Sequence, residues 1–401
     1  MSYDFDAVVD RRHSDSVKWD RYKGRDVIPM WVADMDFRCA PEILAALHRV
    51  VDHGVFGYAH APDGLTACLL GRLRERYGWT VEAEHLVWLP DLGAGLHLAC
   101  RAAGDEGDQV LVMPPIYPPF LAAPKRSGRQ RLDVPLSLRN GRWAMDLDAV
   151  ARAITPRTRA VLLCNPHNPV GRLYTAEELR GLMDLCRRHD LVVCSDEVHA
   201  ELTLDADLRH VPTAMLSADA AARTITLLSA SKTFNVPGLR CAVAVIADEG
   251  LRRRFRGAFA GLVSGGNPFG YAASLAAWRD AEPWRLALVD YLRGNRDLVE
   301  RAIADTPPLA MTHVEATYLA WIDARALCAD NPAALFEEAG VGLMDGKEFG
   351  APGYVRLNFG CPRSLLREAL DRIGRAVGGA TIGHDAAIAG RQRPGRLPGS
   401  L

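Results

Sequence analysis

Short apolar runs alternate with longer mixed stretches along the chain, and polar or aromatic residues follow each run at once. The clearest runs cover residues 110–113, 160–164, 191–194 and 225–228. Runs of this length, separated by helical stretches, are typical of buried parallel strands. An open parallel sheet binds ligands outside the carboxyl ends of its strands, so the residues after these runs are candidates for a site.

Helix signals occupy the stretches between the runs. Thr175 with Glu178 three residues later forms a capping box, and the apolar residues 179, 182, 183 and 186 then fall on one face of the predicted helix. A glycine-bearing turn at 90–95 precedes the apolar stretch 96–100 and predicts another helix start. In the last third, residues 317–322 and 354–358 are predicted strands, and 365–377 an amphipathic helix.

Lys232 is the candidate nucleophile and base. It closes the polar turn Ser229-Ala230-Ser231-Lys232 directly after the run 225–228. A lysine at the mouth of a buried strand is placed for a lowered pKa and covalent use, which suits a bond to the aldehyde of pyridoxal phosphate. A surface lysine after a strand is the alternative, and it is the commoner case for a lysine taken alone.

The residues after the other runs each have a role if the ligand is pyridoxal phosphate. A carboxylate beside the pyridine nitrogen keeps the ring protonated and able to accept electrons, which is a role for Asp196. The other candidates are assigned by chemistry, namely ring stacking by Tyr117, donation to the ring 3-oxygen by Asn168, phosphate binding by Ser229 and Arg240, and backbone N–H groups at the helix start of Leu92 and Gly93.

Each of these residues also has a structural interpretation. Tyr117 could be a core aromatic, Asp196 a helix cap, and Asn168 a turn residue between two prolines. His199 and Arg356 could equally be structural or surface residues. Their joint occurrence at matching strand ends favours the site. The histidines at 13, 48, 53, 60 and 85 have no ligand spacing, so no metal site is predicted.

The set Tyr117, Asn168-Pro169-Val170-Gly171, Asp196, Ser229-x-x-Lys232 and Arg240 resembles the aspartate aminotransferase superfamily, fold type I of the pyridoxal phosphate enzymes. The resemblance covers residues 5–378. Within that superfamily the chain resembles the MalY/PatB-type carbon–sulfur lyases, which are similar to cystathionine β-lyases. The segments that carry this closer resemblance are 31–37 (WVADMDF), 54–58 (GVFGY), 196–199 (DEVH) and 354–358 (YVRLN).

The resemblance implies an α/β fold, a three-layer sandwich around a mainly parallel sheet, with a smaller α+β domain. It places the large cofactor-binding domain at 46–289 and the small domain at 1–45 and 290–378. Composition changes after Gly378, so 379–401 is predicted to be a disordered tail. The resemblance further implies that Arg356, with Asn168 and Trp31, binds the substrate, and that His199 lies at the cofactor. It also implies that Tyr58 reaches the cofactor phosphate of a neighbouring subunit in a homodimer.

Three functions remain open at this point. The first is β-elimination from cystathionine or another S-substituted L-cysteine, which yields thiol, pyruvate and ammonia. The second is an aminotransferase that needs a 2-oxo acid; Arg240 favours it, because the lyase branch often lacks an arginine there. The third is a regulatory binding protein on the same fold. Side-chain specificity is expected from residues 31–37, 264–269 and 345–350, none of which has a readable code.

Composition and charge limit the classes of partner and the cellular compartment. The net charge is −1 and the pI is near 6.9, so no electrostatic footprint for nucleic acid or a membrane surface is visible. No run approaches the roughly 18 apolar residues of a membrane span. Nine cysteines without a C-x-x-C pair fit a reducing compartment, and we expect a cytoplasmic enzyme whose substrate is an amino acid, that is, a small molecule.

Overall fold

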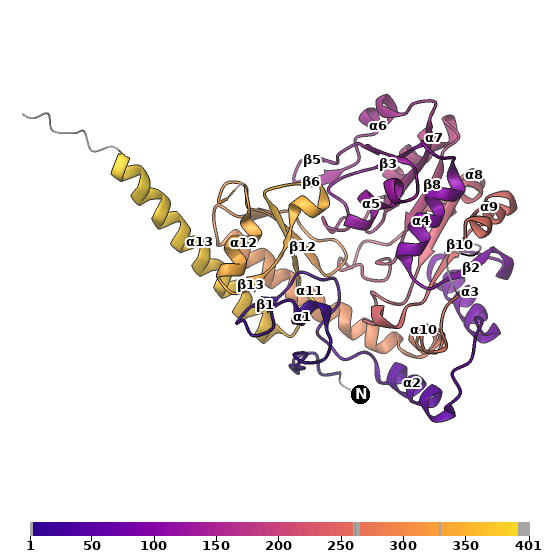
Figure 1. The fold of residues 1–401 in the computed structure, drawn as a ribbon, viewed down its shortest axis with the longest axis horizontal. Helices are drawn as coiled ribbons and strands as arrows, with labels where there is room; N and C mark the ends of the chain where they lie inside the picture. The colour runs from indigo at the N-terminus through magenta and orange to yellow at the C-terminus, as the bar shows by residue number, and fades with distance from the viewer. Residues whose placement is uncertain (1–2, 260, 262–264, 329, 392–401) are drawn as a thin grey trace, which may run out of the picture.

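The computed structural model describes residues 3–259, 261, 265–328 and 330–391 (Figure 1). Its largest element is a seven-stranded sheet in the order β2-β10-β9-β8-β7-β3-β4. The strands are β2 (Leu86–Leu89), β3 (Gln109–Val112), β4 (Gln130–Asp133), β7 (Thr158–Cys164), β8 (Val192–Asp196), β9 (Thr224–Leu228) and β10 (Ala242–Val245). Strand β10 runs in the opposite direction to the other six strands of this sheet. The predicted mainly parallel sheet is therefore confirmed.

The sheet is covered on both faces, which explains why its central strands are continuously apolar. Along β7, Ala160 and Leu162 join one core cluster while Val161 and Leu163 join another, because successive side chains point to opposite faces. The first face carries α4 (Leu92–Ala103), α5 (Pro118–Arg126) and α9 (Glu249–Phe259). The second carries α6 (Leu147–Ala153), α7 (Ala176–Arg188) and α8 (Ala218–Arg223). The three-layer sandwich is thus confirmed.

The predicted helix signals appear at their positions. The Thr175 hydroxyl accepts a hydrogen bond from the Glu178 amide, and the Glu178 carboxylate accepts one from the Thr175 amide. All four apolar residues of the predicted face are buried in α7. Helix α4 starts at Leu92, earlier than the apolar stretch alone indicates, because the Asp91 side chain caps the amide of Ala94.

A second group of elements surrounds a smaller antiparallel sheet in the order β11-β12-β15-β14. Its strands are β11 (Ala310–Met311), β12 (Leu319–Asp323), β14 (Met344–Asp345) and β15 (Tyr354–Asn358). Strand β12 starts two residues later than predicted because Thr317 has a positive φ of 77°. The N-terminal strand β1 (Ile28–Pro29) pairs in parallel with β13 (Val341–Gly342), so an N-terminal segment joins the C-terminal group of elements here (Figure 1).

The remaining helices and one hairpin pack around these two groups of strands or link them. They are α1 (Val17–Asp20), α2 (Pro41–His53), α3 (Asp63–Tyr77), α10 (Pro268–Asp280), α11 (Glu282–Ala304), α12 (Pro332–Glu338), α13 (Arg363–Arg391), and the hairpin of β5 (Ser137–Arg139) and β6 (Arg142–Ala144). None of the helices within the described ranges is both long and apolar enough to cross a bilayer.

The C-terminal prediction needs a correction. Helix α13 continues to Arg391, whereas the sequence predicts a helix over 365–377 and disorder from 379. Residues 380–391 are rich in alanine, the best helix former, and that propensity extends a helix already started by packed residues. Residues 392–401 lie outside the described residues.

Candidate active site

A cavity of 260 Å³ opens at the carboxyl ends of β7, β8 and β9. Its walls come from the residues that follow these strands, from the start of α4, and from Ala33 in the N-terminal segment. Nine of the residues predicted to bind the cofactor line it: Leu92, Gly93, Tyr117, Asn168, Asp196, His199, Ser229, Lys232 and Arg240. The residues predicted from the strand ends therefore lie around one cavity, as expected.

Lys232 projects into this cavity from the turn after β9. Its Nζ donates a hydrogen bond of 2.7 Å to the Ala33 carbonyl oxygen. Burial lowers the pKa of Lys232 to about 8, and the nearby Arg356 charge works in the same direction against the carboxylates of Asp34 and Asp196. A substantial fraction of the amine is therefore neutral near physiological pH, as a nucleophile or base requires.

Asp196 ends β8 and is almost completely buried. One carboxylate oxygen accepts a hydrogen bond of 3.1 Å from the amide of Val198. Burial raises the pKa of Asp196 to about 6, although that amide and the Lys232 charge oppose the rise. A buried carboxyl of this kind favours a cationic N–H group as its partner in the cavity.

His199 and Tyr117 form part of the apolar wall. Burial lowers the pKa of His199 to about 3, with Lys232 and Arg356 adding to the effect, so its imidazole is neutral. The ring lies edge-on to Tyr318, with centroids 5.7 Å apart, and its Nδ1 is buried without a hydrogen-bond partner. Tyr117 lies at the start of α5, and burial raises its pKa, so the phenol stays protonated.

The opposite end of the cavity is rich in hydrogen-bond donors. The amide of Ser231 donates to the Ser229 hydroxyl, which itself donates to the Cys241 carbonyl at 2.6 Å. Helix α4 begins here, and a Cβ on Gly95 would come within 2.9 Å of Leu227, so glycine lets this helix start lie close to β9. Arg240 is 69% exposed and lies 3.6 Å from the Asp91 carboxylate. A helix start, two serines and an arginine suit a phosphate group.

Arg356 lies deep beside the cavity on β15, only 1% exposed. It donates to the Asn168 side-chain oxygen at 3.1 Å and to the Trp31 carbonyl at 2.6 Å, and its Nε is buried without a partner. Burial lowers the pKa of Arg356 to about 10, so it remains a cation. Asn168 thus joins the guanidinium to the cavity wall, and the pair suits a carboxylate.

Two predicted residues lie elsewhere. The Trp31 indole is not among the residues that line the cavity, and its N–H donates to the Lys18 carbonyl, while its own carbonyl holds Arg356. Tyr58 is fully exposed and is not among the residues that line this chain's cavity. Of the specificity segments, 264 lies outside the described residues, and the rest of 264–269 does not line the cavity.

Several residues at the site were not predicted. Asp91 caps α4 and approaches Arg240; its position before a glycine turn is an N-cap signal that could have identified it. Ser231 lines the donor-rich end of the cavity, and it could have been predicted from the same turn as Lys232. Ala33 contributes only a backbone carbonyl, and Tyr318 supports that carbonyl with a 2.9 Å hydrogen bond, so no side-chain pattern marks either role.

The donor set fits pyridoxal phosphate at three separate points. A partly neutral lysine amine meets the requirement for a bond to an aldehyde, and a buried carboxyl without a cationic partner at hydrogen-bond distance meets that of a ring nitrogen. The donor-rich end of the cavity meets the requirement of a phosphate. Tyr117 also lines the cavity and offers an aromatic face for a ring.

Comparisons with known proteins agree with this geometry. A family model, aminotransferase class I and II, matches residues 25–373. Cystathionine beta-lyase PatB of Bacillus subtilis is 35% identical over 93% of this chain and 99% of its own.

Two crystal structures are similar over nearly their whole length. OvoB is 45% identical, with a TM-score of 0.91, and the match covers 94% of this chain and 99% of that one. Cystalysin from Treponema denticola, which contains pyridoxal 5'-phosphate, is 28% identical with a TM-score of 0.90. That match covers 94% of this chain and all of cystalysin.

Proposed function

This chain belongs to the aminotransferase class I and II family, and we propose that it is a pyridoxal phosphate-dependent carbon–sulfur lyase. Its substrate would be cystathionine or another S-substituted L-cysteine, and its products a thiol, pyruvate and ammonia. The observation that carries the proposal is the near full-length match to a cystathionine beta-lyase. The cavity, with Lys232, Asp196 and Arg356 around it, supplies the chemistry that such a reaction needs.

Pyridoxal phosphate, when bound, supplies an aldehyde that links to amines and a ring that withdraws electrons from the substrate Cα. Asp196 would hold the proton on the ring nitrogen. Arg356 and Asn168 would bind the substrate carboxylate and orient the Cα–H bond. The neutral Lys232 amine would take the Cα proton, and the electron pair left on Cα would form the double bond to Cβ as the Cβ–S bond breaks.

The leaving thiolate takes up a proton to become the free thiol, and water converts the remaining three-carbon fragment to pyruvate and ammonia. If Lys232 instead returned its proton to a cofactor atom, the same residues would support transamination. Arg240 is the residue that favours this second candidate, an aminotransferase, because its guanidinium lies at the donor-rich end of the cavity.

Product analysis separates the two candidates. Purified protein would be incubated with pyridoxal phosphate and cystathionine, and pyruvate and free thiol measured with and without an added 2-oxo acid. Pyruvate and thiol without the acid support the lyase. Turnover only with the acid, together with formation of its amino-acid counterpart, would establish the aminotransferase and contradict the lyase proposal. A binding-only role requires no turnover on a broad panel of amino acids.

We also propose a homodimer in which Tyr58 completes the partner's site. In the single chain Tyr58 is fully exposed, Val55 is 71% exposed and Phe56 is 57% exposed, so a short apolar segment faces solvent. Phe56 stacks on Phe269, which ties this segment to α10. Sedimentation would measure the assembly, and a monomer at micromolar concentration would contradict the proposal.

The domain division and the compartment remain proposals as well. All strands of the large sheet lie between 86 and 245, and all strands of the four-stranded sheet lie between 310 and 358, which supports domains at 46–289 and at 1–45 with 290–378. Helix α11 crosses the boundary between them.

All nine cysteines are free thiols, which supports a reducing compartment such as the cytoplasm.

A further inference from the structure

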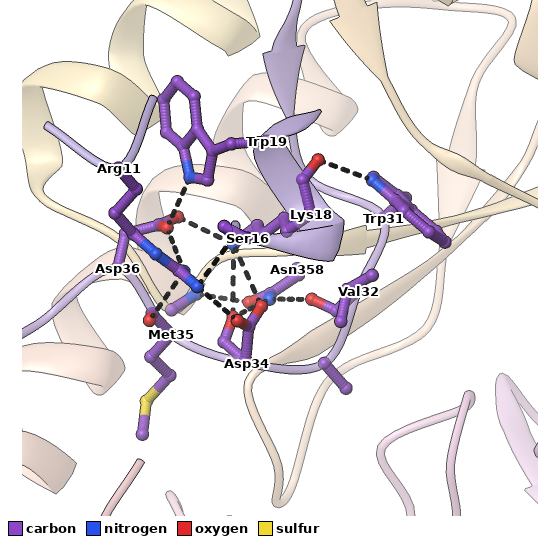
Figure 2. A network of polar contacts seen from close by, with 12 residues as sticks. Arg11, Ser16, Lys18, Trp19, Trp31, Val32, Asp34, Met35, Asp36 and Asn358 are labelled. Atoms are coloured by element: carbon purple, nitrogen blue, oxygen red, sulfur yellow. Dashed lines mark hydrogen bonds and ion pairs between the residues drawn. The ribbon is translucent and has the colours of Figure 1, made fainter. Parts of the chain in front are cut away.

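Residues 31–37, which contribute Ala33 to the cavity lining and which we call the wall, contain no helix or strand and are held by side chains from elsewhere (Figure 2). Six of their seven carbonyl groups accept side-chain hydrogen bonds. The donors are Arg356 to Trp31, Asn358 to Val32 and Asp34, Lys232 and Tyr318 to Ala33, Lys18 to Asp34, Arg11 and Asn235 to Met35, and Asn235 to Phe37. The backbone path of this wall therefore depends on its anchors.

Four charged side chains form the largest of these anchors. Arg11 lies 2.7 Å from both the Asp34 and the Asp36 carboxylates, bridging them as Figure 2 shows. Lys18 lies 2.7 Å from the second oxygen of Asp36 and 3.9 Å from Asp34. The Trp19 indole also donates to Asp36. Two cations and two anions therefore balance in this cluster, which we call the N-terminal charge cluster.

Two members of the cluster are almost completely buried, and the opposite charges around Asp36 and Arg11 offset the cost of burying them. Lys18 is 1% and Asp36 is 3% exposed. Burial works to raise the pKa of Asp36, but Lys18, Trp19 and Arg11 outweigh it and lower that pKa. Burial likewise works to lower the pKa of Arg11, but the carboxylates of Asp34 and Asp36 outweigh it and raise that pKa. The charges of Asp36 and Arg11 are therefore stabilised by their partners in the cluster.

The cluster reaches the reactive amine by two routes. Lys18 donates at 3.1 Å to the Asp34 carbonyl, next in the chain to the Ala33 carbonyl that accepts from Lys232. Asp34 is also the carboxylate whose charge most favours protonation of Lys232, ahead of Asp196. The first route fixes an atom in contact with the amine, and the second sets the field that the amine experiences.

We infer that Arg11, Lys18, Asp34 and Asp36 are positioning residues for Lys232: they hold the Ala33 carbonyl against its amine and keep the Asp34 charge compensated. The inference rests on the proposed role of Lys232. Without Arg11, the cluster carries one excess negative charge beside the amine. Without the Asp34 carboxylate, it carries one excess positive charge. These two changes must affect proton binding by Lys232 in opposite directions.

Apart from Asp34, the groups that face the same amine are left unchanged by the test. The titratable groups around it, from every element packed against it, are Asp34, Tyr117, Asp196, His199, Tyr318 and Arg356. Of these, only Asp34 belongs to the N-terminal charge cluster. A variant at Arg11 therefore changes the field at Lys232 without altering a group that lines the cavity.

The composition makes Lys232 easy to observe. The chain has only five lysines among its 48 basic residues: Lys18, Lys23, Lys125, Lys232 and Lys347. The full chain, without cofactor or substrate, would be labelled with trace acetic anhydride across a pH series, and each lysine quantified by mass spectrometry. Exposed Lys125 and Lys347 serve as internal references. The labelling midpoint of Lys232 is the readout.

The expected result has opposite signs for two variants. Arg11→Gln raises the midpoint of Lys232 and Asp34→Asn lowers it, each by roughly half a pH unit or more. Arg12→Gln is the matched control, because Arg12 is the adjacent arginine, is 69% exposed and pairs with the exposed Asp10. It leaves the midpoint unchanged. Identical midpoints in all three variants, or shifts of the same sign in the first two, would overturn the inference.

Folding of each variant is checked by circular dichroism. Arg11→Lys keeps the charge and the wild-type midpoint, so it replaces Arg11→Gln if that variant does not fold, and Asp34→Asn must still lower the midpoint. A midpoint in Arg11→Lys that departs from wild type would then contradict the inference. Because no cofactor, substrate or turnover enters the measurement, failure of the proposed lyase activity leaves its outcome unaffected.

Discussion

Asp36 and Asp196 are both buried carboxylates, yet their surroundings push their pKa values in opposite directions. Asp36, in the N-terminal charge cluster, is surrounded by Lys18, Arg11 and the Trp19 indole, which lower its pKa. Asp196, at the end of β8, has one backbone amide, and burial raises its pKa to about 6. The first carboxylate is compensated within the chain and serves structure. The second is left for a cationic partner in the cavity.

The largest expected effect tests the cavity side of this comparison. Lys232→Ala removes the amine that we propose as nucleophile and base, so we expect turnover to fall by about 10³-fold or more. The thermal midpoint should stay close to wild type, because Lys232 makes a single hydrogen bond to Ala33. Pyruvate release from cystathionine is the measurement. A variant with wild-type turnover would contradict the assigned role.

The cluster side is tested by removing its buried cation. Lys18→Met leaves Asp36 undercompensated in a buried position, and we expect the free energy of unfolding to fall by about 3 kcal/mol. Lys23→Met, at an exposed lysine, is the control and should change stability little. Denaturant unfolding measures both. The double variant Lys18→Met with Asp36→Leu should recover part of the loss, since no unpaired charge remains.

Asp196→Asn should stabilise the cofactor-free chain, whereas Lys18→Met destabilises it. The folded-state pKa of Asp196 is raised from 3.8 to about 6, so the ionised carboxyl destabilises the folded chain above that pH. We expect the variant to be more stable than wild type by about 3 kcal/mol at pH 8. The advantage should shrink as the pH falls from 6 and vanish below about 4, where the carboxyl is protonated in both states.

Denaturant unfolding at pH 8 and at pH 4 decides this prediction. A destabilised variant at pH 8 would mean that Asp196 is compensated within the chain, as Asp36 is. The same variant should bind pyridoxal phosphate less tightly, because an amide cannot hold a proton on the ring nitrogen. Equal affinity in variant and wild type would place the ring nitrogen elsewhere.

The smallest expected effect is a pH dependence. With a pKa of about 8, Lys232 should capture pyridoxal phosphate about fivefold faster at pH 8 than at pH 7, because only the neutral amine reacts. Between pH 9 and 10 the rate should change less than about twofold, since the amine is already neutral. Borohydride reduction followed by peptide mass spectrometry measures the capture. A rate that keeps rising tenfold per unit to pH 10 would indicate a solvated lysine.

The two regions also differ in how far the sequence predicts them. Asp196, Ser229 and Lys232 follow short apolar runs, and a parallel sheet brings such positions to one edge, so their convergence could be predicted. Asn168 also follows such a run, but the role of Arg356, and that of Asn168 in binding the substrate, came from family resemblance rather than from a pattern. Their 3.1 Å contact joins positions 188 residues apart, which no local signal encodes.

The N-terminal charge cluster was not predicted at all. Lys18, Asp34 and Asp36 look like ordinary solvated charges in sequence, and their burial depends on contacts with distant residues such as Asn358. The length of α13 was missed for a related reason, because its alanine-rich end has too little to bury for a pattern to indicate it. Local periodicity predicts elements, whereas these features depend on which elements meet.

The side-chain anchors of residues 31–37 set an order of events during synthesis. The wall is made early in translation, but Tyr318, Arg356 and Asn358, which hold its carbonyl groups, are translated at least 285 residues later. We therefore expect a ribosome-bound chain to acquire cofactor affinity only after residue 358 has left the exit tunnel. Capture of pyridoxal phosphate by stalled chains of increasing length would show whether the pocket is completed that late.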